Sequence, residues 1–206
     1  MSKKTVPDFA HEQAFPADRS DVVCGIDEAG RGPWAGPVVA AAVILDPAKV
    51  PAGLNDSKKL SAAKREALFA EIMACAHVGI GAASVERIDR DNILQATMWA
   101  MSEAVRQLPL APTAALVDGN RLPQLPCPAR ALIKGDALSL SIAAASIVAK
   151  VTRDRMMIAL AKDHPAYGWE RNMGYGTAQH QVGLRNAGVT PHHRRSFAPI
   201  RALLSA

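Results

Sequence analysis

Apolar segments along the chain alternate between strand-like and helix-like patterns. Four short apolar runs predict strands, over residues 22–26, 38–45, 77–85 and 114–117. Apolar positions at helical spacing predict four helices, over residues 61–76, 91–108, 137–163 and 177–186. Strands that alternate with helices in this way predict an α/β fold.

The first strand is followed at once by two acids, Asp27 and Glu28. Carboxylates at the end of a buried strand lose hydration, which they tolerate only with hydrogen bonds, a counter-charge or a metal ion. Gly30 and Gly32 flank Arg31 just beyond, where the missing side chains allow a ligand to approach the peptide N–H groups. This arrangement favours a metal site that faces a phosphate, although a solvated, capped turn explains this stretch equally well.

The same stretch formally matches a dinucleotide-binding fingerprint. Gly30-Arg31-Gly32-Pro33-Trp34-Ala35 has the G-x-G-x-x-G/A spacing, which requires a helix to open after it. Pro33 and Pro37 flank the expected helix start, and the residues that follow are strand-like. The sequence therefore disfavours a nucleotide-dependent oxidoreductase.

Two further acids stand next to a glycine at the end of an apolar segment. Asp118 precedes Gly119, and Asp136 follows Gly135. One such end is ordinary turn chemistry, but three in an alternating strand and helix pattern predict that the acids meet at one edge of a sheet. Clustered carboxylates repel unless cations lie among them, and hard oxygen ligands suit Mg²⁺ or Mn²⁺.

Basic residues are concentrated near the C-terminus. The chain carries a net charge of +5, and residues 150–206 hold nine lysines and arginines against three acids. This imbalance is typical of a polyanion-binding surface, with a solubility surface as the alternative. Tyr175 lies between two glycines, which suits stacking on a base or a sugar, although tyrosines in turns also simply pack. Ser146 shares a helix face with Lys150 and Asp154, and this face either meets the acids or forms a row of ion pairs.

The remaining composition indicates an ordinary intracellular protein. A length of 206 residues suits one domain with at most a small appendage, and the polar residues 1–20 predict a flexible N-terminal tail. The three cysteines are scattered and lack zinc-ligand spacing, as expected in a reducing cytoplasm. Neither a signal peptide nor an apolar run of about 20 residues is present, so we expect a cytoplasmic monomer without a membrane span.

From about residue 21 to 199, the chain resembles bacterial ribonuclease HII in the order and spacing of its motifs. These motifs are Asp27-Glu28-Ala29-Gly30-Arg31-Gly32-Pro33, Asn55-Asp56-Ser57-Lys58-Lys59-Leu60, Val117-Asp118-Gly119, Lys134-Gly135-Asp136, Ser146-Ile147-Val148-Ala149-Lys150-Val151-Thr152-Arg153-Asp154, Gly174-Tyr175-Gly176-Thr177 and His193-Arg194-Arg195-Ser196-Phe197.

The resemblance implies a ribonuclease H-like fold, with a mixed central sheet flanked by helices and a small helical C-terminal extension. It implies a catalytic domain over residues 21–163 and a substrate-binding extension over 164–206. The implied activity is cleavage of the RNA strand in RNA–DNA hybrids, including single ribonucleotides embedded in duplex DNA, as needed in ribonucleotide excision repair.

The resemblance also implies roles for single residues. Two divalent ions would be held by the catalytic acids, which are Asp27, Glu28, Asp118 and Asp136. The ribose 2′-hydroxyl would be bound by backbone groups of Gly30, Arg31 and Gly32. Tyr175 would stack at the RNA–DNA junction, and Lys58 and Ser146 are further expected substrate contacts. Met173 departs from the family, in which a basic residue often precedes the glycine, so a local phosphate contact is in doubt.

Both lines of reasoning favour hydrolysis assisted by two metal ions, with 5′-phosphate and 3′-hydroxyl product ends. The alternative from another class is a non-catalytic protein that binds hybrids or RNA through its basic C-terminal part. Under that hypothesis the acids are structural, and their clustering near a polyanion has no explanation.

Overall fold

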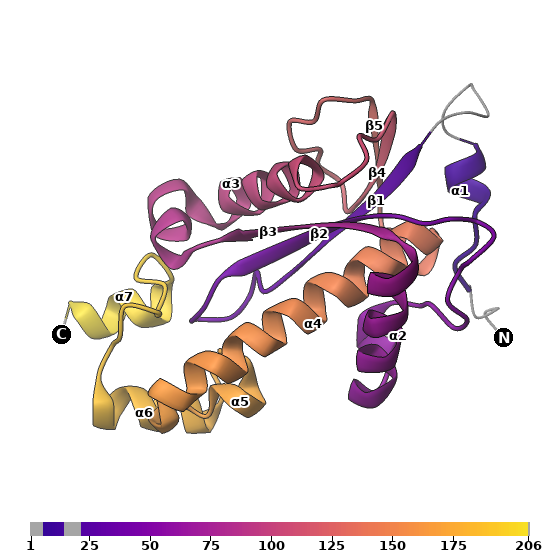
Figure 1. Ribbon diagram of the computed structural model, residues 1–206. Coiled ribbons are helices and arrows are strands. Elements are labelled where there is room, and N and C mark those ends of the chain that lie inside the picture. Colours follow the sequence, from indigo (N-terminus) through magenta and orange to yellow (C-terminus); the bar gives the residue numbers. More distant parts are fainter. Residues whose placement is uncertain (1–5, 15–21, 206) are drawn as a thin grey trace, which may run out of the picture.

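The central sheet of the computed structural model has five strands in the order β3-β2-β1-β4-β5 (Figure 1). The structure describes residues 6–14 and 22–205. The strands are β1 (Val23–Ala29), β2 (Val38–Ile44), β3 (His77–Ala83), β4 (Ala114–Asp118) and β5 (Ala129–Leu132). Neighbours are antiparallel from β1 to β3 and parallel from β1 through β4 to β5, so the predicted mixed sheet is confirmed.

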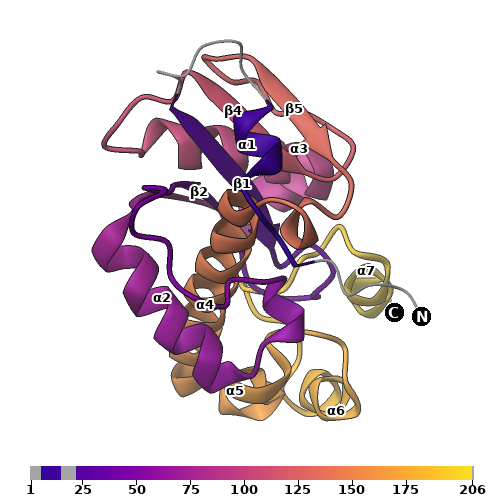
Figure 2. The ribbon, with the colours of Figure 1, turned by 90° about the vertical axis from the view of Figure 1, so that its right-hand side faces the viewer.

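Helices cover both faces of this sheet. The longer ones are α2 (Ala62–Cys75), α3 (Val85–Arg106), α4 (Leu140–Asp163) and α6 (Ala178–Ala187). The shorter ones are α1 (Ala10–Gln13), α5 (Trp169–Asn172), α7 (Ala198–Leu204) and the 3₁₀ turns η1 (Ser57–Lys59), η2 (Gly135–Ala137) and η3 (Pro165–Tyr167). Figure 1 shows α3 on one face and α4 on the other, and Figure 2 shows α2 alongside α4.

The central strand β2 is apolar throughout because both of its faces are covered. All seven of its residues are buried. Val38 and Ala40 belong to the core cluster under α3, whereas Ala41 and Val43 belong to the cluster formed with α2 and α4. A strand buried on both faces shows a continuous apolar run instead of alternation. The same strand rules out the helix that a dinucleotide fingerprint requires.

Helix α4 lies directly against β1 because Gly25 has no side chain. A Cβ atom at this position would lie 2.1 Å from the backbone carbon of Ser141. The first half of α4 is almost entirely buried, and Ser139 caps it by accepting a hydrogen bond from the N–H of Ile142 (3.2 Å). This contact brings the start of α4 close to the strand that carries Asp27.

Two predicted boundaries are wrong. Helix α3 begins at Val85, with Ser84 as its N-cap, instead of near residue 91. Asn92 interrupts α3 with a φ of 67°, and its side chain accepts hydrogen bonds from the N–H groups of Leu94 and Gln95. The prediction therefore placed the start of α3 at the Asn92 cap inside the helix and missed the N-cap at Ser84. Asp136 lies in η2, beyond the end of β5, and not at the end of the strand itself.

The C-terminal elements pack against the second half of α4. A third core cluster joins Met157 of α4 to Trp169, Leu184 and Ile200, and it includes Ala35 from the loop between β1 and β2. The residues after α4 thus form a helical extension, as predicted, while the division of the chain at residue 163 stays a prediction. Within the described residues, no helix is both long enough and apolar enough to cross a membrane.

Residues 6–14, which fall within the flexible tail predicted over residues 1–20, contact the start of α4. Asp8 pairs with Ser139 in an isolated β-bridge, and the short helix α1 follows. The buried Glu12 accepts hydrogen bonds from the Ser139 hydroxyl (2.6 Å) and the Ser141 N–H (2.9 Å). A carboxylate at a helix N-terminus is stabilised by the exposed N–H groups and the helix dipole, which anchors this segment. The other residues of the predicted tail, 1–5 and 15–20, lie outside the described part.

Glu12→Ala is expected to lower the free energy of unfolding by about 1–3 kcal/mol, because it leaves the Ser139 and Ser141 donors buried without their acceptor. Chemical denaturation measures the change. Gln13→Ala, at the exposed neighbouring position, is the matched control. Equal stability of the two variants would show that the Glu12 contact does not anchor the segment.

Candidate functional site

Strand alternation places Asp27 and Asp118 on the α4 face of the sheet. Ile26 and Val117 pack into the core under α3, so the residue that follows each of them points the opposite way. Ile26 and Val117 are also paired in register across the parallel strands β1 and β4. The two carboxylates therefore leave neighbouring strands at the same level and on the same side.

A hydrogen bond places Asp136 near these two acids, and Glu28 follows Asp27 directly on β1. Asp118 Oδ1 accepts a hydrogen bond from the Gly135 N–H (2.7 Å), which fixes η2 and with it Asp136. Asp27 Oδ1 accepts from the N–H of Glu28 (2.7 Å). The Glu28 carboxylate lies 3.3 Å from the guanidinium of Arg31. We call Asp27, Glu28, Asp118 and Asp136 the carboxylate cluster.

The electrostatics of the carboxylate cluster are unfavourable. Burial, and then the charges of Glu28 and Asp118, raise the pKa of Asp27 well above its ordinary value. Burial, Asp56 and Asp118 raise the pKa of Asp136 to about 6. Burial also raises the pKa of Glu28, against the opposing effect of Arg31. The folded chain therefore holds desolvated acids close together with too little positive charge among them.

Lys58 lies among these acids. Burial acts to lower its pKa, but four carboxylates together raise it, namely those of Asp27, Asp56, Asp136 and Asp118. Ser146 positions the turn that carries Lys58, since its hydroxyl accepts a hydrogen bond from the Ser57 N–H (3.2 Å). Ser146 is itself buried, with 3% of its surface exposed, so its observed contact is with the protein.

Asp56 is a residue of the site that the sequence analysis did not single out. Its carboxylate interacts with both Asp136 and Lys58. It also accepts a hydrogen bond from the Lys58 N–H (2.9 Å). The sequence offered one indication, because Asp56 stands close to Lys58 in a motif quoted above. Asp56 is far along the chain from Asp136, so the sequence alone did not predict that the two carboxylates interact.

The donor chemistry of the carboxylate cluster fits divalent cations. Among residues 6–14 and 22–205, no group of three or more His, Cys, Asp or Glu side chains is already arranged to hold a metal ion. The cluster nevertheless offers hard oxygen ligands from four side chains whose charges repel one another. Mg²⁺ and Mn²⁺ favour such ligands, and a cation among them offsets the repulsion.

The loop of residues 30–37 presents bare backbone next to an exposed aromatic ring. Gly30 has a φ of 95°, in the left-handed region that favours glycine. Arg31 and Gly32 are exposed, and a Cβ atom on Gly32 would lie 3.4 Å from the Tyr175 ring. Tyr175 is 51% exposed. The structure thus brings together the glycines and the tyrosine that the sequence analysis selected.

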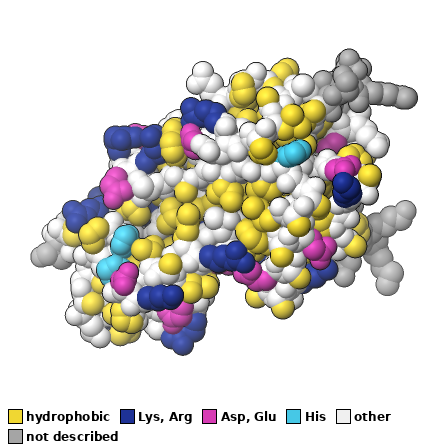
Figure 3. Space-filling view, viewed as in Figure 1, with side chains coloured by type: hydrophobic (Ala, Val, Ile, Leu, Met, Phe, Trp, Pro, Cys, Tyr) yellow, Lys and Arg dark blue, Asp and Glu magenta, His cyan; other side chains and the backbone are white. Residues whose placement is uncertain are grey.

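Two of the arginines that the sequence analysis counted toward a basic C-terminal surface do not lie at the surface. Arg153 and Arg194 are buried, with 2% and 0% of their surfaces exposed. Both bind backbone carbonyl groups of the 30–37 loop. Lys150 pairs with Asp154 (2.6 Å), as the ion-pair alternative predicted. On the face in Figure 3, basic and acidic side chains are interspersed.

Two buried histidines hold the backbone at Tyr175. His180 Nδ1 lies 3.0 Å from the Tyr175 carbonyl oxygen, and His180 Nε2 lies 3.0 Å from His193 Nε2. The indole N–H of Trp169 also donates to His180 Nε2 (3.2 Å). The sequence analysis quoted His193 in a motif without a role and did not select His180, because nothing in their spacing reveals that they meet.

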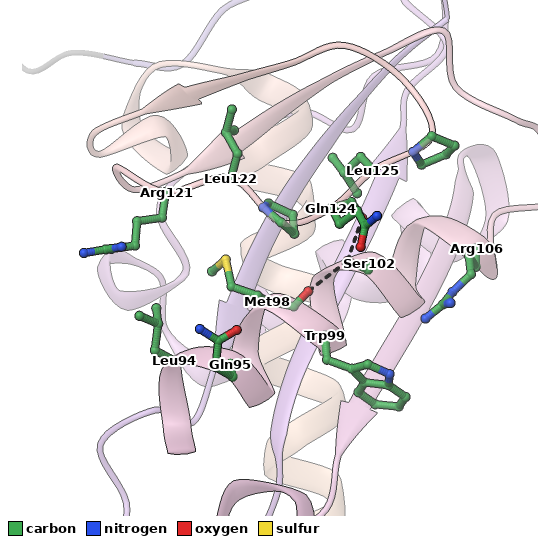
Figure 4. Close-up of a pocket in the computed structure, with 12 residues that line it drawn as sticks. Leu94, Gln95, Met98, Trp99, Ser102, Arg106, Arg121, Leu122, Gln124 and Leu125 are labelled. Atoms are coloured by element: carbon green, nitrogen blue, oxygen red, sulfur yellow. Dashed lines mark hydrogen bonds between the residues drawn. The ribbon is translucent and has the colours of Figure 1, made fainter. Parts of the chain in front are cut away.

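A separate cavity of about 870 Å³ lies between α3 and residues 121–126 (Figure 4). Met98, Trp99 and Leu125 line it and also pack against the core. Arg106 and Arg121 extend from its two ends (Figure 4). It lies on the α3 side of the sheet and contains no member of the carboxylate cluster, so it is distinct from the candidate site.

The mixed sheet covered by helices on both faces has a ribonuclease H-like fold. The family model described as Ribonuclease HII matches residues 24–200. The chain therefore belongs to the ribonuclease HII family, endonucleolytic hydrolases that cleave the RNA strand of RNA–DNA hybrids.

Individual relatives agree with this assignment. A ribonuclease HII from Parvibaculum lavamentivorans is 61% identical over 203 residues, which cover 97% of this chain and 74% of the relative. The crystal structure of ribonuclease H2 from Pyrococcus horikoshii OT3 has a TM-score of 0.75 and 26% identity, with 89% of this chain and 97% of the other covered. The RNase HII of Archaeoglobus fulgidus, solved as a complex with PCNA, has a TM-score of 0.72 and 28% identity, with coverages of 84% and 93%.

Asp27→Asn is expected to raise the free energy of unfolding by about 1–2 kcal/mol near neutral pH in the presence of a chelator. The raised pKa means that ionised Asp27 destabilises the folded state, so the neutral amide removes an unfavourable charge. The gain shrinks as the pH falls and is lost below about 4, the ordinary pKa of an aspartate, where the wild-type carboxyl becomes protonated in the unfolded state as well. Asp46→Asn, at an exposed position, is the control for denaturation measurements. A less stable Asp27→Asn variant would contradict the electrostatic account.

Proposed function

We propose that this chain cleaves the RNA strand of RNA–DNA hybrids and also cuts duplex DNA at a single embedded ribonucleotide. The observation that carries the proposal is the self-repelling carboxylate cluster at the end of β1, from which the chain continues directly into the 30–37 loop with its exposed Arg31 and Gly32. A cut immediately 5′ of the ribonucleotide, with 5′-phosphate and 3′-hydroxyl ends, is the expected product.

In this proposal the carboxylate cluster holds two divalent ions, Mg²⁺ or Mn²⁺. Bound there, such ions lower the pKa of a water molecule and stabilise the leaving 3′-oxygen, so no side-chain nucleophile is needed. Asp27 and Asp118 supply oxygen ligands from the sheet, and Asp136 supplies one from η2. Glu28 completes the set from the next position on β1, where Arg31 orients its carboxylate.

The residues around the cluster bind the substrate. Lys58 carries a positive charge beside the acids, where a phosphate of the scissile strand would lie. Ser146 acts through the Lys58 turn, since its observed contact is with Ser57. The exposed backbone at Gly30, Arg31 and Gly32 offers donors to a ribose hydroxyl. Such an enzyme would work in the cytoplasm, as a monomer, in ribonucleotide excision repair.

The direct test uses a DNA duplex that contains one ribonucleotide, with Mg²⁺ or Mn²⁺ and then with chelator. The wild-type chain is expected to cut it only with metal, and Asp136→Asn is expected to lower turnover by more than about a hundredfold because a ligand is lost. Binding of the duplex should persist in this variant. Asp46→Asn is the matched control, at an exposed carboxylate outside the site. Tight binding without any metal-dependent cut would favour the non-catalytic alternative.

Tyr175→Ala is expected to slow cleavage at the ribonucleotide junction by about tenfold or more, because stacking on a base contributes about 1–3 kcal/mol. Affinity for an all-DNA duplex should change less. Tyr175→Phe keeps the ring and should restore most of the rate. Single-turnover cleavage and equilibrium binding on the same duplexes separate the two effects, and an equal loss in both would reject a specific role at the junction.

A further inference from the structure

The guanidinium group of Arg194 binds four carbonyl oxygens of the 30–37 loop. The distances are 2.5 Å to Gly30, 2.9 Å to Arg31, 3.0 Å to Gly36 and 3.1 Å to Pro37. The side chain is fully buried and forms no ion pair with a carboxylate among the described residues. Backbone carbonyls thus replace the water that this charged group loses on folding.

These contacts fix the direction of two peptide groups. In a trans peptide, the carbonyl of one residue and the N–H of the next point in opposite directions. Since the carbonyls of Gly30 and Arg31 point at the Arg194 guanidinium, the N–H groups of Arg31 and Gly32 point away from it. Both residues are exposed, and neither N–H has an acceptor within the described part of the chain.

The free donors lie beside Tyr175. Gly32 approaches the exposed Tyr175 ring so closely that an added Cβ atom would touch it at 3.4 Å. A ligand whose hydroxyl group accepts hydrogen bonds from these N–H groups would therefore also contact the Tyr175 ring. A ribonucleotide within a duplex has both features.

We propose that Arg194 is a positioning residue for recognition of the ribose 2′-hydroxyl, because it orients the N–H groups of Arg31 and Gly32 toward the substrate. This inference rests on the proposed function. A deoxyribose in the same place offers no 2′-oxygen and leaves the oriented donors unpaired, which is how a site built for a hydroxyl rejects its deoxy analogue. Arg194 touches no substrate atom and acts only through the loop.

The chemistry of the arginine side chain suits this role. Its planar fork offers five N–H donors in a fixed geometry, whereas a lysine offers a compact charge on a flexible stem. The backbone of Arg194 is anchored as well, since its N–H donates to the Trp34 carbonyl (2.8 Å) and the Gly36 N–H donates to His192 (2.9 Å). Lysine at this position keeps the charge but cannot hold four carbonyls at once.

The experiment introduces Arg194→Lys into the Asp136→Asn chain, which is expected to bind the duplex without cleaving it. Equilibrium binding is measured for a duplex with one ribonucleotide and for the same all-DNA sequence. The parent is expected to prefer the ribonucleotide duplex, and Arg194→Lys is expected to reduce this preference by about tenfold or more. Arg195→Lys is the matched control, because the Arg195 side chain is exposed and makes no contact with the 30–37 loop.

The outcomes separate this inference from the proposed function. A parent without any preference would overturn both. A parent that prefers the ribonucleotide duplex, together with a folded Arg194→Lys variant that keeps the preference, would overturn the inference alone. Equal weakening on both duplexes would also overturn it, because a merely structural role predicts that result.

Thermal denaturation shows whether Arg194→Lys folds. If it does not, Arg194→Ala in the same background is measured with added methylguanidinium and, separately, with methylammonium. Return of the ribonucleotide preference with methylguanidinium alone supports the proposal, because only the planar group can replace the lost fork. No return with either cation overturns it.

Discussion

Seven hydrogen bonds from two buried guanidinium groups to backbone carbonyls hold the 30–37 loop against α4 and the C-terminal segment. Arg153 comes from α4 and Arg194 from the segment after α6, and both reach the 30–37 loop. Burial lowers the pKa of both, to about 10 for Arg153 and about 9 for Arg194, where the nearby charge of Arg153 contributes as well. Removing the partners of a buried charge costs several kcal/mol, so loop, helix and C-terminal segment form one interdependent unit.

Strand β1 connects this unit to the acids. Its last residues carry Asp27 and Glu28, and the chain then enters the loop that the arginines hold. Gly25, on the same face as Asp27, allows α4 to approach, and α4 in turn carries Arg153 and the Ser146 that positions the Lys58 turn. The spacing of a few residues along one strand thus couples the carboxylate cluster to the loop, and a shift of β1 would displace both.

The carboxylate cluster destabilises the folded chain through the repulsion between its buried acids. Burial and the neighbouring acids raise the pKa values of Asp27 and Asp136, and the positive charge of Lys58 offsets only part of the repulsion. Glu12 shows the opposite case: it is also a buried acid, but its carboxylate accepts two hydrogen bonds at the start of α4. The difference lies in the surroundings, since Glu12 Oε1 has two donors at the start of α4, although Glu12 Oε2 has no partner among the described residues, whereas the cluster has mainly other acids as neighbours.

Local signals predicted much of the secondary structure. Ser61 and Thr177 cap α2 and α6 where expected, because an N-cap depends on residues only three positions away. The start of α3 was missed because Asn92, itself a good cap, drew the boundary away from Ser84. The anchoring of residues 6–14 was missed for another reason: Glu12 meets Ser139 across a separation of 127 residues, and nothing near Glu12 indicates that contact.

The sequence alone predicted four of the five strands, the four longer helices and the segments that carry the four acids, the Gly-Arg-Gly stretch and Tyr175, because these depend on periodicity and on motifs within short segments. Only the tertiary structure decided that Arg153 and Arg194 are buried supports of a loop instead of surface charges, that Asp56 joins the acids, and that His193 meets His180. Composition counts an arginine as a positive charge wherever it lies. Whether that charge faces solvent or backbone carbonyls depends on which distant segments pack around it.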